Sequence, residues 1–405
     1  MTKPELLMPA GDLDRLKTAI TFGADAVYIG AETMSLRAAA HNFSLDDIKE
    51  GVAFAHERGA KVYVAANIFA HNEDLAKAMK LFLQLKSVKP DGLIISDPGV
   101  FQLARKLVPE IPIHISTQAN NTNYATYDFW YEQGVRRVVS ARELSIDELA
   151  KIHENIPEDM EIESFVHGAM CISYSGRCLI SNFLTGRDAN QGGCTHPCRW
   201  SYHLVEEQRP GQYMPVFEDE RGTYLYHSKD LCMIEHIPEL VGAGIASLKV
   251  EGRMKNALYV ATVARVYRQA IDDYFEDPAI YEAHKADYMA EINKSSNRTF
   301  CTGFYFGKPG PESQIYDSNV TLTECIYLGT IFREDGKAAF IQKNKFSVGE
   351  EIEVLRPGCE PIKAQVLGLV NESGESVESA PHASEKLYVD LGIELCERDI
   401  MRKAQ

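Results

Sequence analysis

The cysteines of this chain are its most distinctive chemical feature. Four of the nine lie close together, in the spacing Cys171-x6-Cys178-x15-Cys194-x3-Cys198. Four thiolates complete the ligand set of a tetrahedral zinc ion or of a [4Fe-4S] cluster. Neither pair has the two-residue CxxC spacing that zinc sites favour, so the pattern leans toward an iron-sulfur cluster and leaves zinc open. Ordinary buried thiols are the third alternative.

The sequence also indicates the cellular compartment of the protein. The first residues, MTKPELLMPAGDLDRL, contain no signal-peptide core, and no run of eighteen apolar residues occurs. We therefore expect a cytoplasmic protein with no membrane partner, in a compartment where clustered cysteines more often bind metal than form disulfides.

The charge is unevenly distributed. The net charge of −16 argues against an indiscriminate nucleic-acid binder. Between residues 165 and 204, however, the charged residues are Arg177, Arg187 and Arg199 against Asp188 alone. If the substrate is RNA, we expect these three arginines to contact its phosphates.

The elements that must position the cysteines follow a βα alternation. Short apolar runs rich in β-branched residues predict strands at residues 5–9, 25–30, 61–67, 92–96, 111–116, 136–140, 161–167 and 246–252. Amphipathic helical patterns separate most of them. Eight such units predict a (β/α)8 TIM-like barrel, with an open doubly wound sheet as the alternative. The cysteine segment follows a strand, which is the end where barrel enzymes carry their chemistry.

Two segments depart from this pattern. Residues 201–228 alternate apolar and polar side chains around an RPG turn and predict an inserted β-hairpin. After about residue 320 the chain changes to short strands such as CIYLGTIF and EEIEVLRPG, which predict a small C-terminal β-barrel module. We therefore expect two domains, a catalytic barrel over residues 1–320 and the module over residues 321–405.

The cysteine segment also resembles a known family. The run Glu163-x-Phe165-x-x-Gly168-Ala169-Met170-Cys171-x4-Gly176-x-Cys178-x-x-Ser181 is similar to the signature of the collagenase-like peptidase family U32. The resemblance extends to MPAG near the start, to SLKVEGRMK and to the terminal β module. Within the family, the segments YSGRCLIS and RDANQGGC most resemble the tRNA hydroxylation protein P branch.

That resemblance implies a function. It implies an enzyme that forms 5-hydroxyuridine at the tRNA wobble position and requires prephenate and an iron-sulfur cluster. The ligands that it implies are Cys171, Cys178, Cys194 and Cys198. In some related branches the fourth ligand lies later, so Cys232 is an alternative to Cys198. Expected partners are tRNA, prephenate, and a paired family member or a second copy of the chain.

A dicarboxylate such as prephenate needs cations at the open end of the barrel. Arg142 follows the sixth predicted strand, and Lys249 and Arg253 flank the eighth. Gln118 and Asn67 follow two other strands and are candidate hydrogen-bonding partners. The sequence assigns no catalytic residue.

Two other functions fit the same cysteines. A peptidase needs an activated nucleophile or a metal-bound water, and the sequence contains no HExxH and no GxSxG. His167 lies four residues before Cys171, but a thiolate that binds a cluster is not free to act as a nucleophile. The second alternative is a non-catalytic iron-sulfur scaffold or redox partner.

Overall fold

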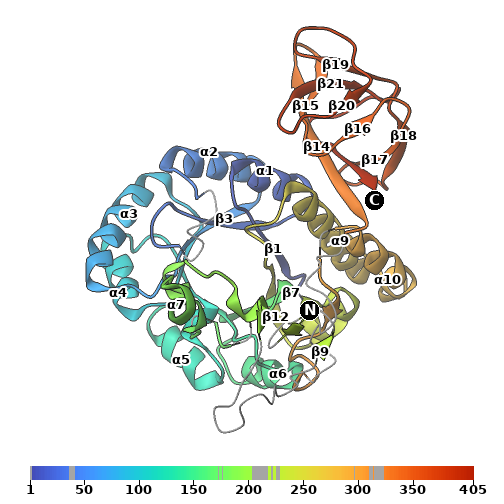
Figure 1. The fold of residues 1–405 in the computed structure, drawn as a ribbon. Helices are drawn as coiled ribbons and strands as arrows, with labels where there is room; N and C mark the ends of the chain where they lie inside the picture. The colour runs from blue at the N-terminus through green and yellow to red at the C-terminus, as the bar shows by residue number, and fades with distance from the viewer. Residues whose placement is uncertain are drawn as a thin grey trace, which may run out of the picture.

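The computed structural model describes residues 2–35, 42–171, 173–175, 177–202, 218–219, 222–224, 229–295, 297–309, 313 and 323–405. Its main body is a closed barrel of eight parallel strands (Figure 1). The strands are β1 (Glu5–Pro9), β2 (Ala26–Gly30), β3 (Lys61–Ala66), β4 (Gly92–Ile95), β5 (Ile113–Ile115), β6 (Arg137–Val139), β7 (Glu161–Ala169) and β12 (Ile245–Val250). Because β12 pairs with both β1 and β7, the sheet has no free edge between them. The predicted barrel is confirmed, and the open doubly wound alternative is wrong.

Helices surround the barrel, as Figure 1 shows. They are α1 (Leu13–Thr21), α2 (Leu45–His56), α3 (Leu75–Val88), α4 (Pro98–Leu107), α5 (Tyr124–Glu132), α6 (Ile146–Glu154), α8 (Ile237–Gly242), α9 (Ala257–Glu276) and α10 (Pro278–Asn293). Several begin at side chains that satisfy the first free N–H groups: Ser44 and Ser145 each form a capping box with the residue three positions later. The buried apolar stripes of these helices cover the outside of the barrel.

Strand β7 continues beyond the barrel and carries an added pair of strands. Its last residues pair antiparallel with β11 (Asp230–Cys232), and β11 pairs with β13 (Phe300–Cys301). Neither short strand was predicted. They bring a distant part of the chain to the place where β7 leads into the cysteine segment.

The predicted β-hairpin over residues 201–228 falls mostly outside the described residues. The parts that are described are β8 (Ser201–Tyr202), β9 (Glu218–Asp219) and β10 (Gly222–Tyr224). They form a small antiparallel sheet in the order β8-β10-β9.

The C-terminal module is an antiparallel half-barrel with its own apolar core, which includes Leu328, Phe340 and Phe346. Its seven-stranded sheet has the order β18 (Ile362–Gln365), β17 (Glu351–Leu355), β22 (Ile400–Ala404), β14 (Cys325–Glu334), β15 (Lys337–Ile341), β21 (Lys386–Asp390) and β19 (Gly368–Asn371). Strands β16 (Phe346–Ser347) and β20 (Ser379–Ala380) pair separately. The predicted boundary between residues 320 and 321 lies outside the described residues and stays a prediction.

The module contacts the barrel domain at α9 and α10, on one side of the molecule (Figure 1). No helix in the described part of the chain is long and apolar enough to cross a membrane.

Candidate functional site

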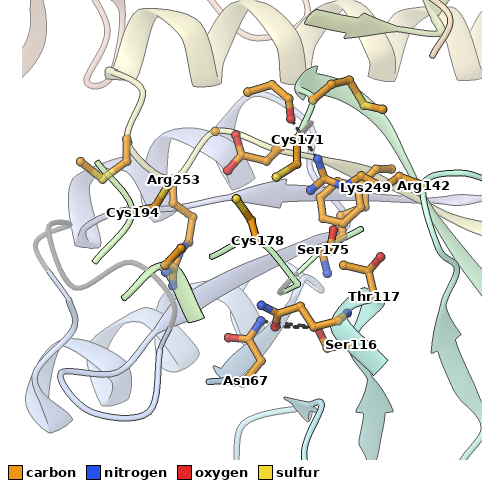
Figure 2. Close-up of a pocket in the computed structure, with 18 of the residues that line it drawn as sticks. Asn67, Ser116, Thr117, Arg142, Cys171, Ser175, Cys178, Cys194, Lys249 and Arg253 are labelled. Carbon is orange, nitrogen blue, oxygen red and sulfur yellow. Dashed lines mark hydrogen bonds between the residues drawn. The ribbon is translucent and has the colours of Figure 1, made fainter. Parts of the chain in front are cut away.

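A cavity of about 630 Å³ opens at the carboxyl ends of the barrel strands. Its walls contain all four predicted cysteine ligands and all five predicted substrate-binding residues: Cys171, Cys178, Cys194, Cys198, Asn67, Gln118, Arg142, Lys249 and Arg253. Figure 2 labels all of these except Cys198 and Gln118. The placement follows from topology, because the ends of parallel barrel strands meet on one face. The cavity is the candidate site.

The cysteine segment lies across the barrel mouth because its backbone is tied to barrel loops. Asn190 accepts a hydrogen bond from the backbone N–H of Phe69, which follows β3, at 3.2 Å. Arg177 donates from Nε to Asn120 Oδ1, near the end of β5, at 2.8 Å. Figure 1 accordingly shows α7 (Ile180–Thr185), the helix of this segment, inside the ring of barrel helices.

Ser181 holds the two halves of the segment together. Its hydroxyl is fully buried, donates to the Arg187 carbonyl at 2.8 Å and accepts from the Thr195 N–H at 3.1 Å. Residues near Cys178 and residues near Cys194 are therefore fixed side by side. This explains how cysteines far apart in sequence line one cavity.

Glycine is needed where β7 turns into the cysteine segment. Gly168 has φ +104°, and a Cβ at this position would lie 2.6 Å from the Glu251 carbonyl oxygen. An L side chain is strained in this conformation and would also clash with backbone. The glycine lets the chain pass close to the loop after β12 and reach Cys171 at the cavity wall.

The four thiols have the chemistry of a metal ligand set. None forms a disulfide; Cys171 is exposed and the other three are partly exposed. Within the described ranges, no three or more His, Cys, Asp or Glu side chains are already arranged to hold a metal ion. The structure therefore provides a shared wall of four thiols, with no preformed metal geometry among the residues that it describes.

Cys232 differs from these four. It does not line the cavity, is buried at the end of β11, and pairs in register with His167. Burial raises the pKa of its thiol to about 12, which opposes the thiolate form that binds metals. Cys198, and not Cys232, shares the cavity with the other three thiols.

His167 is a packed side chain. Its ring is buried against Tyr259 and Tyr267 of α9 and against Phe300, and burial lowers its pKa to about 3. It does not line the cavity, so it forms no catalytic pair with Cys171 there.

The predicted cations are held in three different ways. Arg142 donates from Nη1 to the Ala169 carbonyl at 2.9 Å and stacks 3.7 Å above the Phe165 ring. Its buried Nε has no hydrogen-bond partner among the described residues. Buried donors are rarely left without an acceptor, so Arg142 has capacity for a ligand.

Lys249 and Arg253 are more completely engaged. Lys249 Nζ donates to the buried Glu163 carboxylate at 2.6 Å; burial lowers its pKa and Glu163 opposes that shift. Arg253 donates from Nη2 to Ser35 Oγ at 2.7 Å and crosses Gly30, where a Cβ would lie 2.0 Å from its guanidinium.

The predicted amides form one polar chain at the cavity wall. Asn67 donates to Ser116 Oγ at 3.4 Å, and Ser116 donates to Gln118 Oε1 at 3.3 Å. Figure 2 shows Asn67 and Ser116 at this wall. Ser116 was not predicted and links the two side chains that were.

Two further cations of the cavity were missed, Lys255 and Arg298. Arg298 is buried and held by Asp230, with Nε 3.0 Å from Oδ1. Lys255 belongs to the SLKVEGRMK segment, whose resemblance to the family could have indicated it. Arg298 precedes β13, one of the two short strands that no sequence pattern indicated. Glu251 is the one acidic residue among the lining side chains of the described chain, so the cavity is basic in an acidic protein.

The predicted RNA-binding arginines lie outside the cavity lining. Arg177 is exposed but tied to Asn120. Arg187 is exposed, and Asp188 uses its Oδ1 to accept from the Asn190 N–H. The side chain of Arg199 is outside the described residues. Their role in RNA binding stays a prediction.

Comparisons with known proteins agree with the resemblance. The family model Peptidase family U32 matches residues 11–315, and the Peptidase family U32 C-terminal domain matches residues 323–402. The tRNA hydroxylation protein P1 of Bacillus subtilis is 39% identical over 406 residues, covering 100% of this chain and 95% of that protein. The tRNA hydroxylation protein P of Escherichia coli is 38% identical over 423 residues, covering 94% and 92%. The 23S rRNA 5-hydroxycytidine C2501 synthase of Escherichia coli is 40% identical over 273 residues, covering 67% of this chain and 40% of that protein.

Proposed function

This chain belongs to peptidase family U32, and from that premise we propose that it is an RNA-modifying enzyme that forms 5-hydroxyuridine at the wobble position of tRNA. Two relatives matched over nearly the whole chain are named for tRNA hydroxylation, and a third is named for 5-hydroxycytidine in ribosomal RNA. The observation that carries the proposal is a basic cavity at the open end of the barrel, with four thiols in its wall.

We further propose that Cys171, Cys178, Cys194 and Cys198 hold a [4Fe-4S] cluster. The support is a complete four-thiol donor set with no disulfide, gathered at one cavity. A [4Fe-4S] cluster bound there would supply electron transfer at the cavity. Because metal binding is coupled to local folding, the absence of a preformed geometry is compatible with this assignment.

Prephenate is the proposed second ligand. A dicarboxylate needs charge-assisted hydrogen bonds, and the cavity has Arg142, Lys249 and Arg253 for this purpose. The open donor of Arg142 is the strongest support, because an incoming carboxylate would satisfy it. Phe165 and Tyr28 add apolar surface for the ring of the ligand.

The test of the function is the nucleoside content of tRNA. We expect deletion of the gene to remove a hydroxylated wobble uridine, or a product made from it, as measured by mass spectrometry of digested tRNA. The wild-type gene should restore it, and the Cys171→Ala gene should not. Unchanged nucleosides in the deletion strain would contradict the proposal.

The alternatives from the sequence predict different results. A peptidase would cleave peptides when pure, which we do not expect, because His167 is packed away from the thiols of the cavity. A non-catalytic scaffold would hold iron while leaving tRNA unchanged. A cytoplasmic location, and assembly with a second copy or a paired family member, stay predictions.

A further inference from the structure

The cysteine segment exposes an unusual amount of apolar surface at the cavity mouth. We call this surface the apolar rim; it consists of Tyr174, Leu179, Phe183, Leu184 and Trp200, all exposed. Phe183 on α7 is 86% exposed. Clustered apolar side chains of this kind mark an interaction site more often than single ones do.

The rim residues belong to one packed segment that adjoins the cavity. Helix α7 packs against residues 197–199, next to Trp200, and Ser181 hydrogen-bonds to Thr195 between the two halves. Cys178, the neighbour of Leu179, and Ser175, the neighbour of Tyr174, both line the cavity. A ligand that lies on the rim therefore reaches the cavity directly.

The charge around the rim identifies the class of ligand. Arg177 and Arg187 are exposed in the same segment, where Asp188 is the one acidic residue between positions 165 and 204. An apolar protein surface would not require this local reversal of a net charge of −16. Exposed aromatic rings beside arginines are the usual combination for unpaired nucleotides, because bases stack on the rings and phosphates contact the guanidinium groups.

We infer that the apolar rim is a stacking platform for the unpaired bases that flank the nucleotide to be modified. This inference rests on the proposed function. A base must leave its stack to enter a cavity of about 630 Å³, a size typical of small-molecule pockets. Its neighbours then lose stacking partners, and Phe183 and Trp200 replace them. Such a platform would favour a single-stranded loop over a duplex, because only unpaired bases can stack on it.

The decisive variant is Phe183→Ala, because so exposed a side chain contributes little to folding. We expect it to weaken binding of an anticodon stem-loop RNA about 5- to 150-fold, which is the range for the loss of one base–aromatic stack. Fluorescence anisotropy measures this affinity. Binding of a fully paired RNA of equal length should not change. The matched control is Phe129→Ala on α5, a phenylalanine 52% exposed outside the rim, which should bind as wild type.

Two further variants separate stacking from general apolar contact. Phe183→Trp should keep the affinity, whereas Phe183→Leu should lose it, because leucine keeps apolar area without a π face. Phe183→Ala should leave the salt dependence of binding unchanged, whereas Arg187→Ala should lower its slope by about one unit.

The inference is overturned if Phe183→Ala binds the stem-loop as wild type does while the wild-type gene still restores tRNA hydroxylation. In that case the proposed function stands and the platform fails. It is also overturned if Phe183→Ala changes the oligomeric state and not RNA affinity, which would make the rim a protein interface. If the wild-type protein neither binds nor modifies tRNA, both the platform and the proposed function fail.

Discussion

Arg142 is the residue that tests the proposed binding of prephenate most directly. Its Nε is buried without an acceptor among the described residues, while Nη1 is already bound to Ala169. We expect Arg142→Gln to weaken prephenate binding on the order of 10- to 100-fold by calorimetry, since a charge-assisted hydrogen bond is lost. Arg105→Gln, at an exposed position on α4, is the control and should bind normally. Equal affinities for both variants would place the ligand elsewhere.

His167 makes stability depend on pH. Its folded-state pKa of about 3 lies below the ordinary 6.5, so below pH 6.5 the unfolded chain binds a proton that the folded chain does not. This contribution to stability is complete above pH 6.5 and is lost toward pH 3, by about 1.4 kcal/mol per pH unit. We expect His167→Phe, which keeps a ring beside Tyr259 and Tyr267, to flatten the fall in unfolding free energy between pH 6.5 and 4. A variant that follows the wild-type slope would show that His167 does not titrate as its burial requires.

At this scale the sequence predicted which residues gather at the open end of the barrel, and the roles of these residues stay predictions. The four cysteines, Arg142 and Arg253 line one cavity because barrel topology brings strand ends together. Arg298 was not predictable, because it reaches the cavity through a two-residue strand and its ion pair with Asp230.

Among the elements, α7 and the loops beside it depend on one buried hydroxyl. Removing the Ser181 Oγ leaves the Thr195 N–H and the Arg187 carbonyl without this partner. We expect Ser181→Ala to destabilise the segment locally by about 1–3 kcal/mol. The amide of Thr195 should then exchange with solvent about 5- to 150-fold faster.

The control is Ser173→Ala in the same segment, where the hydroxyl is only partly buried and its contact with the Tyr174 carbonyl is long, at 3.4 Å. Its exchange should match wild type. Unchanged exchange in Ser181→Ala would mean that other contacts hold the segment over the barrel.

The barrel strands were predicted correctly because each has a long apolar pattern in the sequence. All eight barrel strands lie within a few residues of their predicted positions, because buried β-branched runs bounded by turn residues are a strong signal. The strands β11 and β13 have three and two residues and pair over long sequence separations. Local periodicity carries no information about such pairing.

At the scale of the whole molecule, a buried ionic network joins the module to the barrel domain. Arg402 of β22 is fully buried and pairs with Glu291 of α10 at 2.7 Å and with Glu353 of β17 at 2.8 Å. Removing one member of a buried ion pair leaves the other uncompensated, at a cost of about 3–5 kcal/mol. We expect Arg402→Met to unfold the module at a lower temperature than the barrel, in calorimetry.

Lys403→Met is the neighbouring control. Its pair with Glu350 is partly exposed, and exposed pairs contribute about 0–1 kcal/mol. It should therefore unfold as wild type does. Unfolding of Arg402→Met that matches this control would show that the Arg402 network does not hold the module.

The two-part organisation was visible in the sequence as a change from βα alternation to short strands. The contact between the module and the barrel domain could not be predicted from the sequence. It depends on Arg402 and Glu291, which are more than a hundred residues apart. The basic cavity is likewise hidden by a net charge of −16. The net charge of a whole chain does not show how charge is distributed between the cavity and the rest of the surface.

The four cavity thiols are the proposed ligands of a redox centre. This proposal is tested most directly by measuring iron, sulfide and zinc in protein purified without oxygen. We predict about four irons and four sulfides per chain. They should be lost in the four single replacements Cys171→Ala, Cys178→Ala, Cys194→Ala and Cys198→Ala, and retained in Cys232→Ala. Stoichiometric zinc without iron in the wild-type protein would contradict the account.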